Sequence, residues 1–350
     1  MSMQRAFSLF ARSFAAAALF CGLLAAVPAA NAQQPYKIID RWKTGGEGGW
    51  DDLRVDSAAH RLYLSRGLRV DVVDTQTGKL VGSITGLHGT HAIALDTAGK
   101  FGYISDGGGN AIVVFDRATL ATVATIPAGT NPDALVFEPA TQTVWAFNGR
   151  SKNATVIDAA TQKVVATVPL PGKPEFAVID GKGLIFDNIE DKNEIVRIDA
   201  KTNKVTAEWP LTGCESPSGL AFDVDGARLF SVCDGKKMAV TDAKTGKSLA
   251  TPAIGEGPDG AGWDAAHKLA FSSNGGTGTL TVVDASAPGY PVIEELPTQR
   301  SARTMFYDAV SDRIYLPAAE FGPRPAPTPE NPRPRPTIVP GTFTVLVVGR

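Results

Sequence analysis

The chain contains 350 residues, carries a formal net charge of −2 and is 43% hydrophobic. This slightly acidic composition lacks the excess of basic residues that binding to a phosphate backbone requires, so a nucleic acid is not an expected partner. The hydrophobic content excludes a disordered chain, whereas 36 glycines and 24 prolines favour a fold with many turns.

The first 32 residues have the pattern of a secretory signal peptide. Arg5 and Arg12 precede the apolar run FAAAALFCGLLAAV, and an Ala-Asn-Ala sequence follows at residues 30–32. The run is shorter than the roughly 20 apolar residues that span a bilayer, and no later segment approaches that length. We therefore predict cleavage after Ala32, a mature chain of residues 33–350 without a membrane span, and a periplasmic or secreted location.

A cassette of strand, Asp, turn and strand begins with VVDTQTGKLVGSI at residues 72–84 and recurs along the chain. Later copies include VFDRATLATVATI, VIDAATQKVVATV and VTDAKTGKSLATP. The aspartates of the cassette are spaced by 41 to 43 residues and lie at Asp74, Asp116, Asp158, Asp199, Asp242 and Asp284. Such regular spacing identifies a repeat protein. Small and polar residues follow each Asp, so we expect its carboxylate to cap a turn.

Each repeat contains two further short apolar segments before its Asp. In the repeat that contains Asp116 they are HAIALD and FGYIS, and AIVVFD and ATVATI follow them. Four short strands in about 42 residues are typical of a propeller blade, because a twisted sheet buries both its faces only between two neighbours. Seven such first strands occur, so we predict an all-β, seven-bladed propeller with four-stranded antiparallel blades.

The two ends of the sequence fit a closed ring. The segment GTFTVLVVGR supplies only a third strand for the last blade, and YKIIDRWKTGG resembles the fourth strand of the other repeats. We expect this N-terminal strand to complete the last blade, which leaves no sheet edge free. Residues 33–350 are therefore expected to form one domain, and we expect it to be a monomer.

The cassettes VVDTQTGK, VIDAATQK and RIDAKTNK resemble those of the YVTN-repeat, YncE-like seven-bladed propellers of bacterial envelopes. The resemblance covers essentially all of residues 36–350. It implies the propeller fold and an envelope location, but it implies no particular reaction, because one fold of this type carries unrelated functions.

The residues that enter the first strand differ from blade to blade. In a propeller these positions surround the mouth of the central channel, where binding sites commonly lie. Six blades carry a charged or titratable side chain at the corresponding position, and these candidates for ligand binding are Asp51, His91, Asp133, Glu175, Asp259 and Arg303. We expect them to form one ring at the channel mouth.

Three interpretations of this ring remain open. It can bind a small polar ligand or an envelope protein, with Arg303 recognising a carboxylate and the acidic residues an amine or a sugar. It can hold a divalent metal ion that activates water, although the sequence requires no cofactor. It can also be a solvated rim of charges that binds nothing.

Two further features are expected near the same face. Cys214 precedes the first strand of the fifth blade and Cys233 ends its second strand, so antiparallel pairing brings them together and we predict a disulfide. Residues 321–341, FGPRPAPTPENPRPRPTIVPG, form a proline-rich insertion between two strands of the last blade. We expect this insertion to act as a lid, a docking segment or a passive surface loop.

The sequence contains no Ser-His-Asp order, haem-binding CxxCH or zinc-binding helix motif, so no catalytic residue is assigned. We predict an exported binding or scaffold protein that acts through the face at the channel mouth. The alternative is a metal-dependent enzyme of the lactonase or lyase kind with its site at the same place.

Overall fold

The computed structural model describes residues 34–328, 332, 334 and 336–350. The predicted signal peptide lies outside the described residues. Pro35–Arg350 forms one compact unit. In the described part of the chain, no helix is both long and apolar enough to cross a membrane.

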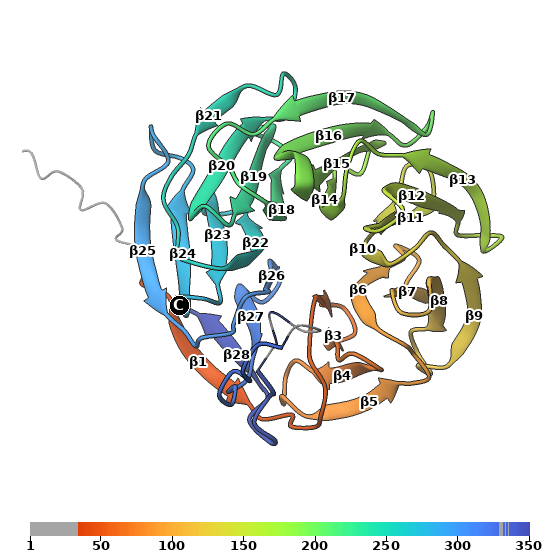
Figure 1. Ribbon diagram of the computed structural model, residues 1–350, viewed down its shortest axis with the longest axis horizontal. Helices are drawn as coiled ribbons and strands as arrows, with labels where there is room; N and C mark the ends of the chain where they lie inside the picture. The colour runs from red at the N-terminus through yellow and green to blue at the C-terminus, as the bar shows by residue number, and fades with distance from the viewer. Residues whose placement is uncertain (1–33, 329–331, 333, 335) are drawn as a thin grey trace, which may run out of the picture. The chain divides into compact units, whose positions relative to one another are not determined.

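The described residues form seven antiparallel sheets of four strands each, set around a common axis (Figure 1). We call each sheet a blade. Blade 1 contains β2 (Leu53–Asp56), β3 (Arg61–Ser65), β4 (Val70–Asp74) and β5 (Leu80–Ile84). Blade 2 contains β6 (Thr90–Leu95), β7 (Phe101–Asp106), β8 (Ala111–Asp116) and β9 (Thr122–Pro127). Blade 3 contains β10 (Pro132–Glu138), β11 (Thr143–Asn148), β12 (Asn153–Asp158) and β13 (Lys163–Pro169).

The next three blades follow in chain order. Blade 4 contains β14 (Pro174–Ile179), β15 (Leu184–Ile189), β16 (Glu194–Asp199) and β17 (Lys204–Pro210), with the short 3₁₀ helix η1 (Glu190–Lys192) after β15. Blade 5 contains β18 (Pro217–Asp223), β19 (Arg228–Cys233), β20 (Lys237–Asp242) and β21 (Ser248–Ala250). Blade 6 contains β22 (Pro258–Asp264), β23 (Leu269–Asn274), β24 (Thr279–Asp284) and β25 (Val292–Pro297).

Blade 7 closes the ring as the sequence predicted. It consists of β26 (Phe306–Asp308), β27 (Arg313–Ala318), β28 (Thr344–Gly349) and the N-terminal strand β1 (Lys37–Trp42). Strand β1 pairs antiparallel with β28 from Lys37 opposite Gly349 to Trp42 opposite Val345. The side chain of Arg350 also stabilises this closure, since it donates to the Tyr36 hydroxyl at 2.5 Å and stacks on the Tyr36 ring.

Burial explains why the sheets stand side by side around the channel. Each blade's first strand contacts the first strand of the next blade. Strand β11 is wholly buried, whereas the outer strand β17 alternates between exposed and half-buried residues. Val136 of blade 3 packs with Ile185 and Val196 of blade 4, and burying each such side chain contributes about 1.5–3 kcal/mol. Every blade therefore relies on both its neighbours for its core.

The aspartates of the repeated cassette cap turns. Asp74 Oδ1 accepts the backbone N–H groups of Gln76 and Thr77 and the hydroxyl of Thr77, at 2.8–3.0 Å. These hydrogen bonds lower the pKa of Asp74. The other five aspartates accept backbone N–H groups two or three residues further on in the same way. Their repetition therefore reflects turn formation.

The predicted disulfide is confirmed. Cys214, just before β18, is bonded to Cys233 at the end of β19, with their Cα atoms 5.4 Å apart. The bond ties the loop that enters blade 5 to its second strand.

The ends of the proline-rich insertion pair with each other. The N–H group of Gly322 donates to the Thr337 carbonyl at 2.9 Å, and that of Val339 donates to the Glu320 carbonyl at 2.8 Å. The ring of Phe321 lies 5.9 Å from that of Trp50, the residue immediately before Asp51. The described ends of the insertion thus lie close to the predicted ring, and a role as lid or docking segment remains a prediction.

Candidate functional site

All six residues predicted to form the ring line one cavity of about 520 Å³ where the first strands begin. Four first strands begin with proline, and the residue after each proline lines the cavity, as Asp133 and Glu175 do. Ser218 takes the corresponding position in blade 5 and completes the set. The cavity therefore receives one polar side chain from every blade, and we call these seven residues the mouth ring.

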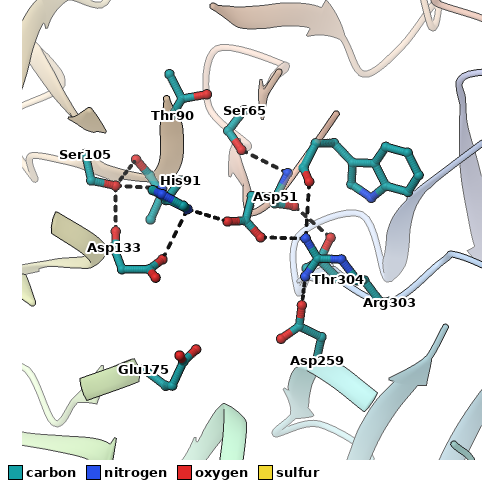
Figure 2. Close-up of polar contacts among 12 residues, drawn as sticks. Asp51, Ser65, Thr90, His91, Ser105, Asp133, Glu175, Asp259, Arg303 and Thr304 are labelled. Atoms are coloured by element: carbon teal, nitrogen blue, oxygen red, sulfur yellow. Dashed lines mark hydrogen bonds and ion pairs between the residues drawn. The ribbon is translucent and has the colours of Figure 1, made fainter. Parts of the chain in front are cut away.

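Five members of the mouth ring form a continuous series of alternating charges (Figure 2). His91 Nδ1 lies 2.6 Å from Asp51 Oδ2 and 3.5 Å from Asp133 Oδ1. Arg303 Nη2 lies 2.9 Å from Asp51 Oδ1, and Arg303 Nη1 contacts Asp259. Each of these two basic side chains is therefore held between carboxylates of different blades.

Glu175 lies outside this series and has its own partner. Its carboxylate accepts from Lys173 Nζ at 2.6 Å, and the same ammonium group contacts Glu190 of η1. All three side chains line the cavity. The third basic group of the site is thus also enclosed by two carboxylates.

Side-chain donors hold the backbone of the mouth ring across the blade interfaces. The Ser105 hydroxyl donates to the Asp133 carbonyl and the Ser273 hydroxyl donates to the Arg303 carbonyl, both at 2.5 Å. The Asn188 amide donates to the Ser218 carbonyl at 2.8 Å. Each donor is the fifth residue of its blade's second strand, and each reaches the following blade. The position of a ring residue therefore depends on the blade before it.

Arg66, directly after β3, fixes the loop that leads to Asp51. Its side chain is fully buried, and its guanidinium lies 3.4 Å from the centre of the Phe343 ring. It donates at 3.1–3.3 Å to five successive carbonyls, those of Gly45, Gly46, Glu47, Gly48 and Gly49. Sequence analysis missed Arg66 because the segment SRGLR resembles an exposed turn. The only signal was a glycine-rich loop whose carbonyls need donors.

The contacts of the mouth ring determine the charge of His91. Burial alone would lower its pKa, but the hydrogen bond to Asp51 and the negative charges of Asp133, Asp51 and Glu175 raise the pKa of His91 to about 9. Burial would raise the pKa of Asp51, yet His91 and Arg303 lower it. At neutral pH the pair is an imidazolium and a carboxylate, so His91 is not poised to accept a proton as a general base.

Three carboxyl groups in the cavity have pKa values near neutrality. Burial raises the pKa of Asp133 to about 6, and the charge of Asp51 adds to this effect. Burial also raises the pKa of Glu175 to about 7, with a further contribution from Asp133. The pKa of Asp52 rises to about 7, again chiefly through burial. The acidic side of the cavity therefore changes its charge between about pH 6 and 7.

Asp187 in β15 is an additional buried acid that sequence analysis missed. Its side chain is fully buried, and its carboxyl oxygens have no side-chain hydrogen-bond partner among the described residues. Burial, followed by the negative charges of Glu175 and Asp133, raises the pKa of Asp187 well above its usual range. The shift favours the neutral form of this carboxyl group, which lies within electrostatic reach of the mouth ring.

A second cavity of about 500 Å³ continues along the channel and shares Asp52 and Phe176 with the first. Most of its lining is apolar and includes Phe137, Phe222 and Phe306. Arg54 also lines it, donating to the Ile93 carbonyl at 3.2 Å and lying over the Phe306 ring. The channel therefore passes from a charged mouth to a largely apolar interior.

Among the described residues, two clusters bring three possible metal ligands within 4.8 Å of one another. One consists of Asp51, His91 and Asp133. The other consists of Asp264, His267 and Asp312, and the guanidinium of Arg350 contacts all three of these side chains. Both clusters offer carboxylate and imidazole ligands, which suit several divalent ions, but the first is the better candidate because the Arg350 guanidinium already neutralises the second. An ion bound at Nδ1 of His91 must displace the proton through which this nitrogen is hydrogen-bonded to Asp51.

No protein-family model matches the chain, and no curated protein matches it either. A chain of hydrazine synthase from Kuenenia stuttgartiensis is similar in structure, with a TM-score of 0.70 over 78% of this chain and 93% of that chain. The two sequences are 15% identical, so the similarity shows the fold alone. Fold and site together define a seven-bladed β-propeller with a charged cavity at its channel mouth.

Proposed function

We propose that this chain is an exported, periplasmic propeller that binds a ligand reversibly through the mouth ring. The observation that carries the proposal is the convergence of side chains from all seven blades on one cavity. Charged groups that are partly removed from water cost stability unless they are paired. A ring needed only for packing has no reason to place two basic groups between carboxylates at an open cavity.

Two further features support the proposed location. Residues 1–32 have the pattern of a secretory leader, and the Cys214–Cys233 disulfide is a bond that persists in oxidising compartments. The repeated cassettes support membership of the YVTN-repeat, YncE-like propellers. In this setting the chain acts as a monomeric binding or scaffold module for a small polar ligand or an envelope protein.

A metal-dependent enzyme of the lactonase or lyase kind is the second candidate. It is favoured by the cluster of Asp51, His91 and Asp133, whose ligand atoms lie within 4.8 Å of one another. A divalent ion bound there would supply Lewis-acid chemistry next to the open cavity. The residues themselves would hold the ion, with Arg303 fixing the second oxygen of Asp51.

The ions and molecules that remain bound to the purified protein distinguish the binding protein from the metal-dependent enzyme. The wild-type protein and the triple variant His91→Gln, Glu175→Gln, Asp259→Asn are purified from the periplasm without chelators or a metal-binding tag. Mass spectrometry then measures divalent ions and the small molecules released by denaturation, and a thermal melt verifies that the variant folds. Glu215→Gln removes an exposed acid of the loop that enters blade 5 and is the control.

The binding hypothesis predicts that a small molecule or protein partner is purified with the wild-type protein and with the control but not with the triple variant. A near-stoichiometric divalent ion that is lost from the variant, together with lactone turnover that a chelator stops, would establish the enzyme instead. If the folded variant retained the same partner, the mouth ring would be excluded as the binding surface.

A further inference from the structure

The positive charges of the mouth cavity are already neutralised within the protein. Arg303 contacts Asp51 and Asp259, and His91 lies between Asp51 and Asp133. These two residues and Lys173, which contacts Glu175 and Glu190, are the basic residues that line the cavity in the described part of the chain. An anionic ligand would therefore have to compete with two carboxylates for each cation.

The negative charges, in contrast, are in excess. Asp52 and Asp234 also line the cavity, and neither takes part in an ion pair among the described residues. Unpartnered acidic groups of this kind are costly to bury unless a cation or a hydrogen-bond donor reaches them. Seven acidic residues and three basic residues line the cavity in the described part of the chain, so carboxyl groups remain in excess even though Asp133 lies near His91 and Glu175 contacts Lys173.

The size and the lining of the cavity restrict which cation fits. A cavity of about 520 Å³ is much larger than a single ion, and Phe176 on its wall is shared with the apolar part of the channel. An aromatic wall next to carboxylates favours an organic cation, because the ring attracts the charge and also packs against carbon. In Figure 2, Glu175 faces Asp133, Asp51 and Asp259 across the open centre of the site.

We propose that the mouth cavity binds an organic ammonium ion, whose nitrogen donates to Asp133 and Glu175 and whose apolar portion lies along Phe176 toward the channel interior. An ammonium group supplies three N–H donors, which matches a site that offers acceptors and no free cation. This inference rests on the proposed binding function and names the class of its ligand. It differs from the metal hypothesis because it leaves the contacts of His91 with Asp51 and Asp133 in place.

The test uses residues 33–350 and isothermal titration calorimetry at pH 8 with three probes of equal length: hexylamine, hexan-1-ol and hexanoate. Hexylamine is expected to bind at least about tenfold more tightly than the other two, because only hexylamine forms charge-assisted hydrogen bonds with carboxylates. Asp133→Asn and Glu175→Gln should each weaken hexylamine binding about tenfold or more. Glu215→Gln, whose exposed side chain lies outside the cavity lining, should change the affinity by less than about twofold.

A variant that is expected to strengthen hexylamine binding shows that weaker binding in the acid variants is not caused by misfolding. Lys173→Met removes the ammonium group that already occupies Glu175 and Glu190, so hexylamine should bind about threefold to tenfold more tightly. A thermal melt of each variant verifies the fold. Weaker binding in the two acid variants together with tighter binding in Lys173→Met would support the inference.

Equal affinities for hexylamine and hexan-1-ol would overturn it, and so would unchanged hexylamine binding in both acid variants. Failure of all three probes to bind would also overturn the ammonium inference, whereas the co-purification experiment decides separately on the binding function. Binding of hexanoate alone would overturn the ligand class and leave the proposed binding function standing.

Discussion

His91 Nδ1 and Asp51 Oδ2 lie 2.6 Å apart, although the two residues belong to different blades and are 40 positions apart in the chain. The same junction contains a backbone hydrogen bond from the N–H group of Asp52 to the His91 carbonyl, at 3.2 Å. The contact that sets the charge of the mouth ring therefore also joins blade 1 to blade 2.

Replacing Asp51 with Asn should lower the pKa of His91 from about 9 toward its ordinary value near 6.5. The amide keeps the shape of the side chain but removes its charge. An NMR titration of the imidazole protons measures the change. Asp106→Asn, beside the exposed ring of His88, is the matched control and should leave the titration of His91 unchanged. If His91 still titrated near pH 9 in Asp51→Asn, the assignment of its proton to this pair would be wrong.

The free energy of unfolding should fall as the pH rises from about 5 to about 9. The folded-state pKa of His91 is raised, so its contribution is fully present below about pH 6.5 and is lost as the pH passes about 9. The raised pKa values of Asp133, Glu175 and Asp52 act in the same direction between about pH 4 and 7, because the folded state binds more protons than the unfolded state. Urea denaturation at pH 5, 7 and 9 measures the slope, and a rise over this range would contradict it.

Asp187→Asn should stabilise the protein at pH 8 and have less effect at pH 4. Because the pKa of Asp187 is raised, holding its carboxyl group neutral costs stability above the pKa of the unfolded chain, and an amide avoids that cost. Thermal melts at the two pH values give the comparison. Asp225→Asn, at an exposed position, should change stability by no more than about 0.5 kcal/mol at either pH. Equal gains at both pH values would point to packing as the cause.

Arg66→Met should destabilise the protein by about 3–5 kcal/mol, because it leaves five loop carbonyls without their shared donor. Urea denaturation measures the loss. Arg150→Met, on the surface, should cost about 0.5 kcal/mol or less. A loss for Arg66→Met as small as that of Arg150→Met would show that the loop keeps its conformation without the guanidinium.

Replacing both Cys214 and Cys233 with Ser should cost about 2–4 kcal/mol, since the disulfide closes a loop with a sequence separation of 19. A thermal melt with and without reductant measures this effect. The wild-type protein in reductant should match the double variant, whereas the double variant itself should not respond to reductant. A wild-type melting temperature that is unaffected by complete reduction would contradict the prediction.

The blades and the mouth ring could be predicted because they follow from repetition. Asp74 and its counterparts mark one turn in each of six blades, and the alternation of side chains along a strand places corresponding residues such as Asp133 and Glu175 on one side. Pairing within the ring could not be predicted. Whether Asp51 or Asp133 lies closer to His91 depends on how neighbouring blades are rotated, which no local pattern encodes.

The burial of charged side chains also could not be predicted from the sequence. In the sequence, Arg66 stands in SRGLR and Asp187 in IFDNIE, and both segments are compatible with a surface turn. Arg66 is covered by the loop of residues 45–49 and by Phe343, which precedes β28 of blade 7, and neither contact is local in sequence. Asp187 likewise becomes an isolated acid only when the strands around it exclude water.

The closure of blade 7 also determines when folding of the propeller can be completed. The hydroxyl of Thr344 donates to the Trp42 carbonyl at 3.1 Å across 302 positions, and β1 has no strand partner other than β28 among the described residues. Because a ribosome makes β1 first and β28 last, β1 must wait for almost the whole chain. Closure thus depends on the last strand of the chain, and a product that ends before Thr344 keeps an open sheet edge that chaperones and proteases can recognise.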